Sequence, residues 1–183
     1  MSVLPIARMG AEVLKLRAAE VTEFKTPALQ RFVSDMVDTM VDANGVGLAA
    51  PQVSQSQRIV IFFVPAARNE GVEFPLTVMI NPVITPLDGA QEEAFEACLS
   101  VPGLTGRVMR FTHIKYSYQD IAGTTVAREA KGFHARVVQH ECDHLDGILY
   151  PQRMANMSSL AFTDVIAAEA KAKGEQLELD EEG

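Results

Sequence analysis

The sequence predicts an α+β fold in which antiparallel-rich sheets pack around a central helix, residues 132–145, that carries a His-Glu-x-x-His (HExxH) motif. Helical patterns interleave with short β-branched runs of the kind that form antiparallel strands. The 183 residues are 48% hydrophobic and 22% charged, which is ordinary for a protein with a buried core. No repeat or linker divides the chain, so we expect residues 1–183 to form a single domain.

Three segments predict helices. Thr26 to Ala43 has an N-cap candidate, a proline at the first helical position and apolar residues at helical spacing. The second helix, Gly132 to Leu145, is closed by Asp146-Gly147. The third runs from about Ser158 to Lys173 and leads into an acidic tail, about 174–183, for which we expect no regular structure.

The strand patterns lie between the helices. Ile59 to Val64 and Leu76 to Ile80 are short, β-branched and bounded by proline or charge, which suits buried strands. Residues 114–118 alternate in polarity, and a turn at Asp120 to Gly123 joins them to the run Thr124 to Ala130. This pattern predicts a hairpin.

Composition excludes several classes of protein. The net charge of -8 argues against a broad phosphate-binding surface, although much of that charge lies in the tail, so we expect no strong nucleic-acid binding. No run of about 18 apolar residues is present, and the first residues lack the features of a secretory signal. We expect a cytoplasmic protein, without a membrane segment, whose two cysteines stay reduced.

The strongest chemical signal is His140-Glu141-Cys142-Asp143-His144. Positions four apart share one face of a helix, so the two imidazoles could bind one metal ion. Glu141 sits beside that face, where its carboxylate could move a proton of a water activated by the metal. A surface helix with two chance histidines is the alternative, and this segment alone does not decide between them.

A catalytic metal site of this type needs three protein ligands and one open position. Cys98, within Glu96 to Ser100, is the candidate for the third ligand, and a Cys and two His set suits zinc or iron among divalent metals. The alternative for Cys98 is a small buried hydrophobic residue. We expect that fate for Cys142, which lies two residues beyond His140 and so points away from the ligand face.

The segment Gly45 to Gln52 is rich in glycine and alanine and is too broken for a helix or a strand. Its small residues would let another backbone approach closely, so it could line a substrate groove. Gln52 could then donate a hydrogen bond to a developing oxyanion. A tight turn between helix and strand explains the segment equally well.

Taken together, these segments resemble the three signature motifs of the peptide deformylase family in order and spacing. They are the glycine-rich stretch ending in Gln52, the Glu-x-Cys-Leu-Ser segment around Cys98, and the Gln-His-Glu-x-x-His run from Gln139 to His144. Flanking residues are also similar to the family, so the likeness covers roughly Val3 to Met154.

The resemblance implies an enzyme of the bacterial cytosol that removes the formyl group from the N-terminal methionine of newly made proteins and releases formate. Cys98, His140 and His144 would bind one divalent metal ion, natively iron(II), which zinc, nickel or cobalt could replace. The implied partners are N-formylmethionyl nascent peptides, met in transient proximity to the ribosome.

The resemblance also implies the catalytic roles. Glu141 would be the general base that deprotonates the attacking water and then the acid that protonates the leaving amine. The Gln52 amide and the backbone N–H of Leu99 would stabilise the oxyanion of the tetrahedral intermediate.

For the substrate, the likeness implies that Gly45, Val46 and Gly47 pair with its backbone like an added strand. Val46 would also lie near the methionine side chain, at one wall of an apolar pocket. Three residues of the central helix would form the other wall: Phe133, Val137 and His140.

Glu96 and Gln139 look like residues that hold Arg110 and the ligand loops in place. Two positions depart from the family. Ala97 stands where the family mostly has glycine, which implies a slightly altered backbone, and Gln152 stands where an aspartate is frequent. The acidic tail differs from the basic C-terminal helix with which some members contact the ribosome, so we do not expect that contact here.

Two other functions remain open. A zinc metallopeptidase also uses a His-Glu-x-x-His helix, but such enzymes typically complete the site with histidine, glutamate or aspartate, which makes Cys98 the discriminating residue. A non-catalytic metal-binding relative is the second alternative. Glu141 and Gln52 argue against it, because neither is needed merely to hold a metal.

Overall fold

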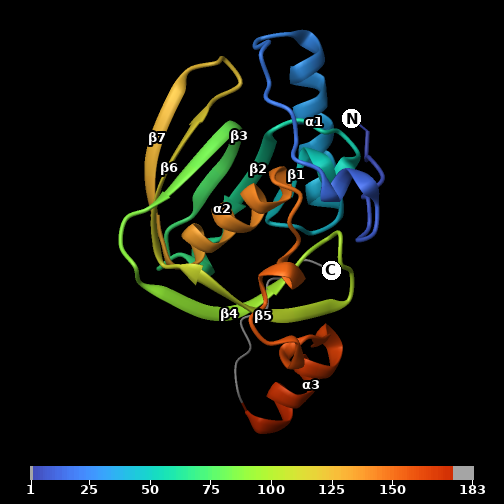
Figure 1. Ribbon diagram of the computed structural model, residues 1–183, viewed down its shortest axis with the longest axis vertical. Coiled ribbons are helices and arrows are strands. Elements are labelled where there is room, and N and C mark those ends of the chain that lie inside the picture. The colour runs from blue at the N-terminus through green and yellow to red at the C-terminus, as the bar shows by residue number, and fades with distance from the viewer. Residues whose placement is uncertain (1, 175–183) are drawn as a thin grey trace.

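Two antiparallel sheets and three α-helices make up residues 2–174, the part of the chain that the computed structural model describes (Figure 1). The five-stranded sheet has the order β1 (Gly47–Ala49), β2 (Ile59–Val64), β3 (Phe74–Pro86), β6 (His113–Gln119) and β7 (Thr125–Lys131). The three-stranded sheet has the order β4 (Gln91–Ala97), β5 (Leu104–Phe111) and β8 (Ala161–Phe162). The predicted α+β class is therefore confirmed.

Helix α2 (Gly132–Leu145) lies between the two sheets and is buried along almost its whole length (Figure 1). It follows directly from β7 and contacts strands of both sheets. Its end is fixed by Gly147, where φ is 72° and a Cβ would lie 2.5 Å from the Lys15 carbonyl oxygen. Only glycine fits that position. Because one helix joins both sheets, we infer that the described residues form a single domain.

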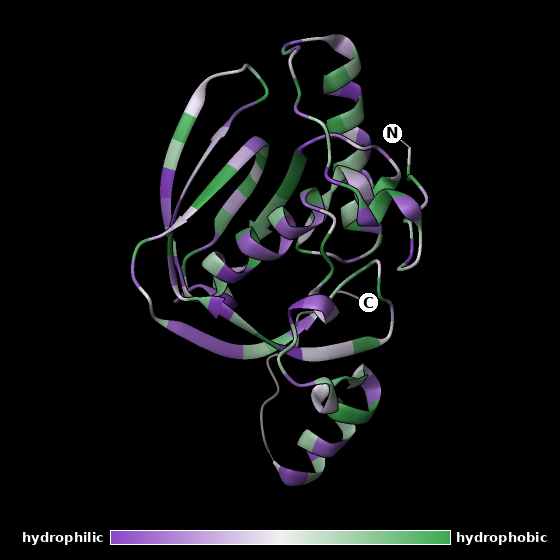
Figure 2. Ribbon diagram, viewed as in Figure 1, coloured by the Kyte–Doolittle hydropathy of each residue, from purple (hydrophilic) through white to green (hydrophobic). Residues whose placement is uncertain are grey.

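Helix α1 (Pro27–Asp42) begins as the sequence predicts. The Thr26 side chain accepts a hydrogen bond from the Leu29 backbone N–H at 3.1 Å, and Pro27 stands at the first helical position. Its apolar face packs against β2, which is hydrophobic from end to end (Figure 2). No helix among residues 2–174 is long and apolar enough to cross a membrane.

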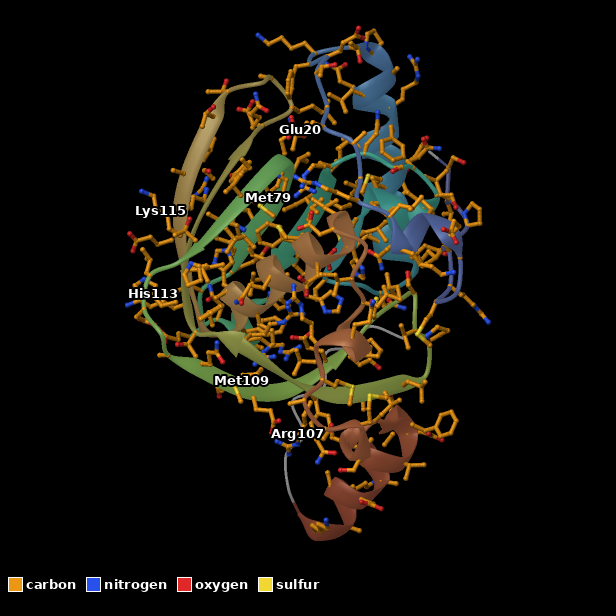
Figure 3. The ribbon with its side chains drawn as sticks, viewed as in Figure 1. Glu20, Met79, Arg107, Met109, His113 and Lys115 are labelled. Atoms are coloured by element: carbon orange, nitrogen blue, oxygen red, sulfur yellow. The ribbon has the colours of Figure 1, made fainter. Side chains whose placement is uncertain are left out.

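The predicted hairpin is confirmed as β6 and β7. Tyr118 pairs with Val126 across the ladder, and the Asp120 carboxylate accepts hydrogen bonds from the backbone N–H groups of Ala122 and Thr124 in the turn. In the three-stranded sheet, side chains alternate between exposed and buried along strand β5. Along β5, Arg107 and Met109 are exposed, while the intervening Val108 and the following Arg110 are buried (Figure 3).

Three expectations were wrong in part. Residues 47–49 are not irregular but form β1, because they pair with residues 60–62 of β2. The third helix does not begin at Ser158: α3 (Thr163–Lys173) begins five residues later, because Ala161–Phe162 pair with β5. Strand β3 extends the predicted Leu76–Ile80 run at both ends. Most of the acidic tail, residues 175–183, lies outside the described residues.

His134, in the first turns of α2, gives a testable dependence of stability on pH. Its ring packs against Phe62 and Phe74, and its Nε2 lies 3.0 Å from the Tyr116 hydroxyl. Burial, with a smaller contribution from Arg128, lowers the pKa of His134 from 6.5 to about 4. As the pH falls from about 6.5 to about 4, His134 is protonated in the unfolded chain but stays neutral in the folded chain. The free energy of unfolding therefore decreases.

We therefore expect His134→Gln, which keeps a hydrogen-bonding side chain but does not titrate, to lose less stability than the wild type between about pH 7 and about pH 4.5. Urea unfolding of both proteins at the two pH values measures this difference. An equal loss in both proteins would show that His134 titrates normally in the folded state.

Candidate metal centre

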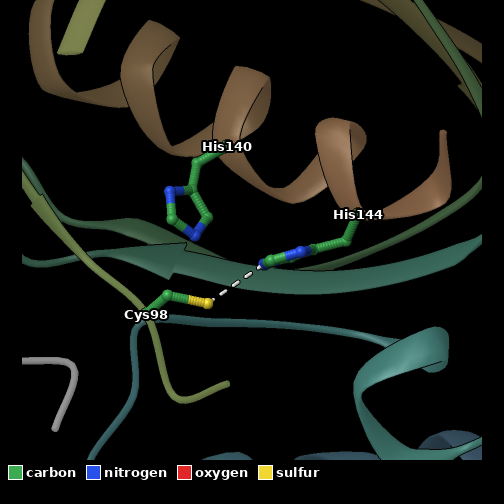
Figure 4. Close-up of side chains that lie close together, drawn as sticks. All are labelled: Cys98, His140 and His144. Atoms are coloured by element: carbon green, nitrogen blue, oxygen red, sulfur yellow. Dashed lines mark hydrogen bonds between the residues drawn. The ribbon is translucent and has the colours of Figure 1, made fainter. Parts of the chain in front are cut away.

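Cys98, His140 and His144 converge beneath α2 (Figure 4). Their ligand atoms all lie within 4.8 Å of one another, and all three side chains are buried. The Cys98 Sγ is 3.4 Å from His144 Nε2. Within residues 2–174 no other group of three or more histidine, cysteine or acidic side chains gathers in this way. The predicted trio is thus together in space, although its first two members are 42 positions apart in the chain.

The secondary structure explains this convergence. His140 and His144 lie one turn apart on α2, with ring centroids 5.0 Å apart. Cys98 follows the last residue of β4, whose sheet packs below the helix. One thiolate and two imidazoles form a donor set suited to zinc or iron, and three protein ligands leave a position for water. Burial first, then His140 and Arg110, holds the pKa of His144 well below its ordinary value, which keeps that imidazole neutral, as a ligand must be.

Glu96 orients the first histidine. Its Oε2 lies 2.9 Å from His140 Nδ1, which directs the other ring nitrogen towards Cys98. Arg110 donates two hydrogen bonds to the same carboxylate, at 2.8 and 2.9 Å, and Arg136 adds a third at 2.8 Å. Burial raises the pKa of Glu96, but Arg110 and His140 more than offset it and hold that pKa well below its ordinary value. Glu96 is therefore an anion at neutral pH.

A further carboxylate, Asp143, extends this network and had no predicted role. Its Oδ2 accepts a hydrogen bond from Arg110 at 2.6 Å, and Arg153 holds both of its oxygens, at 3.1 and 2.7 Å. Gln139 was expected to help hold Arg110 and the ligand loops, and its amide bonds the backbone N–H and C=O of Phe111, the residue after Arg110. The position of Asp143 inside the histidine motif was the sequence signal that could have indicated its part in this network.

Glu141 lies between the two histidines in sequence and is 1% exposed. Its Oε2 has no hydrogen-bond partner among residues 2–174. Burial raises the pKa of Glu141 to about 7, His140 opposes the shift, and Glu96 adds to it. A carboxyl group with a pKa near neutrality can both accept and return a proton.

Gln52 reaches the same site from the 3-10 turn Ala50–Val53, which follows β1. Its Oε1 accepts the Ala49 backbone N–H at 2.8 Å, so the amide orientation is fixed. Its Nε2 then points at the Cys98 sulfur, 3.6 Å away, and at the Ser100 hydroxyl, 3.2 Å away. The structure therefore brings Gln52 to the edge of the metal centre with its donor facing inward.

The remaining predicted residues lie around this centre. Strand β1 is an edge strand that pairs only with β2 among the described strands. Val46, just before β1, and Val137 are buried in one hydrophobic cluster, and Phe133 packs against it. Cys142 belongs to the same cluster and not to the ligand group, as expected for a buried apolar residue.

The fold and the site define a class of protein in which a His-Glu-x-x-His helix supplies two of three ligands for a single metal ion. The family model described as polypeptide deformylase matches residues 3–159. The chain belongs to the polypeptide deformylase family.

Known proteins similar to this chain agree with that assignment. It is 47% identical over 164 residues to peptide deformylase 1 of Nitrosomonas europaea, covering 88% of this chain and 93% of that protein. It is 48% identical over 168 residues to peptide deformylase 2 of Bordetella bronchiseptica, covering 90% and 94%. The crystal structure of class I type b peptide deformylase from Acinetobacter baumannii with Met-Ala-Ser is 42% identical, with a TM-score of 0.79 over 84% of this chain and 100% of that one.

Proposed function

We propose that this protein hydrolyses the N-formyl group from the N-terminal methionine of newly made proteins, releasing formate and a free amine. The observation that carries this proposal is the convergence of a thiol and two imidazoles on one point, with the buried carboxylate of Glu141 on the same helix and in electrostatic interaction with His140. Family membership supports the same reaction. Because the proposed substrate is a newly made protein, we place the reaction in the cytoplasm, in transient proximity to ribosomes.

The residues Cys98, His140 and His144 would hold the metal ion, because their ligand atoms already lie within reach of one cation. A divalent metal bound there would supply Lewis acidity, which makes water acidic enough to yield hydroxide near neutral pH. Glu96 would keep His140 in the ligating tautomer through the 2.9 Å contact with its Nδ1.

Glu141 would carry the proton. It accepts one proton from the water that attacks the formyl carbon, and it returns this proton to the amine nitrogen when the carbon–nitrogen bond breaks. The donors of Gln52 and the Leu99 backbone N–H would stabilise the negative oxygen that forms in between. The fixed Gln52 amide supports this role, since a preorganised donor needs no rearrangement during the reaction.

The substrate would bind along the free edge of β1. An edge strand offers unpaired backbone groups, so residues 45–47 can form main-chain hydrogen bonds with an extended peptide. The methionine side chain would enter the apolar surface that Val46, Phe133 and Val137 share beside His140. An unbranched thioether fits such a surface better than a charged side chain.

We propose iron(II) as the native metal, with zinc, nickel or cobalt able to replace it. Thiolate ligation exposes an iron(II) site to oxidation by air, whereas nickel(II) resists it. We expect an iron-loaded preparation to lose activity in air and a nickel-loaded preparation to keep it. Parallel measurement of aerobic decay tests this, and identical decay would remove the iron hypothesis.

A zinc metallopeptidase is disfavoured because Cys98 occupies the place of the histidine or acidic ligand that such enzymes use. A non-catalytic relative is disfavoured by Glu141, whose Oε2 is buried without a partner among the described residues, a costly arrangement that ligand binding alone does not require.

Formate release from formyl-Met-Ala-Ser, run beside hydrolysis of unformylated Met-Ala-Ser, tests the proposed function. We expect formate from the first peptide and no cleavage of the second. Cleavage of the unformylated peptide would indicate a peptidase, and no reaction with either peptide at full metal occupancy would indicate a non-catalytic protein.

A further inference from the structure

Gly47, the first residue of β1, lies directly against the Glu141 carboxylate. It pairs with Phe62 of β2 and is buried. A Cβ on Gly47 would be 2.6 Å from Glu141 Cδ, 2.9 Å from its Cγ and closer still to its Oε1. Carbon atoms in folded proteins do not approach each other this closely without displacement. The side chain that Gly47 lacks would thus occupy the volume that Glu141 fills.

The need for glycine at this position is one of space and not of backbone shape. Gly132 and Gly147 adopt φ values of 53° and 72°, which disfavour other residues. Gly47 is not among the glycines with positive φ, so its backbone conformation is open to any residue. Alanine would fit the dihedral angles of β1. The only conflict would be the overlap of its Cβ with the Glu141 carboxylate.

The Glu141 carboxylate has little room to move away from a side chain at position 47. Glu141 is 1% exposed, on a helix packed between two sheets. Its Oε2 has no hydrogen-bond partner within residues 2–174, and its other oxygen, Oε1, lies against Gly47 of β1. A displaced carboxylate would have to rotate away from Gly47 and would leave the position that it holds in this structure.

We propose that Gly47 is a positioning residue for the general base: its missing side chain leaves the recess that holds the Glu141 carboxylate in reacting position. The catalytic consequence rests on the proposed function, whereas the steric coupling of the two residues does not. This role is distinct from the main-chain contact with the substrate that residues 45–47 would make.

A double-mutant cycle in activity separates the two roles. We expect Gly47→Ala to lower kcat by about 30-fold with little change in KM or metal content, since a misplacement of about 1 Å can cost on the order of 100-fold. Glu141→Asp withdraws the carboxylate by one methylene and makes room for the new methyl group. In that background Gly47→Ala should cost less than about threefold. A loss that is equal in both backgrounds, or that appears in KM, would overturn the proposal.

A second cycle needs no enzymatic activity. We expect Gly47→Ala to lower Tm by about 5 °C in the wild type, as overpacking does, and to leave Tm unchanged in a Glu141→Ala background. An equal decrease in Tm in both backgrounds would contradict the proposed steric coupling of Gly47 and Glu141. Gly89→Ala is the matched control, because Gly89 has no positive φ and a Cβ added there would meet no atom within 4 Å, so the Tm of this variant should not fall.

The two cycles also distinguish failure of this proposal from failure of the proposed function. If the wild type releases no formate but the Tm cycle shows coupling, the function is wrong and the recess stands. If the wild type releases formate and neither cycle shows coupling, the function stands and Gly47 has no positioning role.

Discussion

Glu141→Ala is expected to lower kcat for formate release by on the order of 10³-fold while the protein keeps its metal ion. The carboxylate is the group proposed to move the proton, and it lies on the helix of the two histidines without being part of the ligand trio. Removing it should therefore leave the three ligand atoms in place. The KM should change little, because the Glu141 side chain is not one of the groups proposed to bind the substrate.

Metal analysis and formate release on the same preparation measure this result. Glu141→Gln preserves the volume of the side chain and should lose activity equally, which separates proton transfer from the cavity that alanine leaves. Glu169→Ala, at an exposed position of α3, is the control for removing a glutamate from a helix. Undiminished activity in either Glu141 variant would overturn the mechanism, and loss of the metal would make Glu141 a structural part of the site.

Cys98→Ala is expected to abolish metal binding and therefore all activity. Its sulfur is the only ligand atom of the trio that does not come from α2, and two histidines on one helix make a much weaker site than three converging ligands. We expect metal content to fall from about one ion per chain to below about a tenth after dialysis against a chelator.

Cys142→Ala is the matched control for this prediction. Cys142 is also a buried thiol, but it packs in the hydrophobic cluster on another side of α2. The Cys142→Ala variant should keep both its metal ion and its activity. If Cys98→Ala retained its metal at the wild-type level, the thiol would not be a ligand and the proposed site would be wrong.

The sequence predicts those parts of the fold whose signals are local. Thr26 and Pro27 define the start of α1, and the helical spacing of its apolar residues continues to the end of the helix. The bounds of α2 agree with the predicted Gly132 to Leu145, because Gly147 ends it with a conformation that few other residues adopt.

Segments whose conformation depends on a distant partner were not predictable in this way. Strand β4 contains Gln91, Glu92 and Glu93 in succession, which have low strand propensity, and it becomes a strand because β5 pairs along its whole length. Ala161 and Phe162 fit the third helix by pattern, yet pairing with β5 overrides that preference.

The candidate site shows the same division. The two histidines and Glu141 follow from one motif on one helix. Cys98 and Gln52 are candidates from their own segments, far away in the chain, and only the structure shows that they lie next to the histidines. The contacts of Asp143 with Arg110 and Arg153 depend on how β5 and the turn after α2 pack against the helix. The spacing of residues in the sequence does not predict that packing.

X-ray absorption spectroscopy of the metal-loaded protein tests most directly whether one thiol and two imidazoles share a single cation. For the zinc form we expect one sulfur ligand at about 2.3 Å and two histidine nitrogens at about 2.0 Å, with a light-atom ligand from solvent. Cys98→Ala should remove the sulfur signal along with the metal. A first shell without sulfur, or one filled by four protein side chains, would contradict the proposed centre.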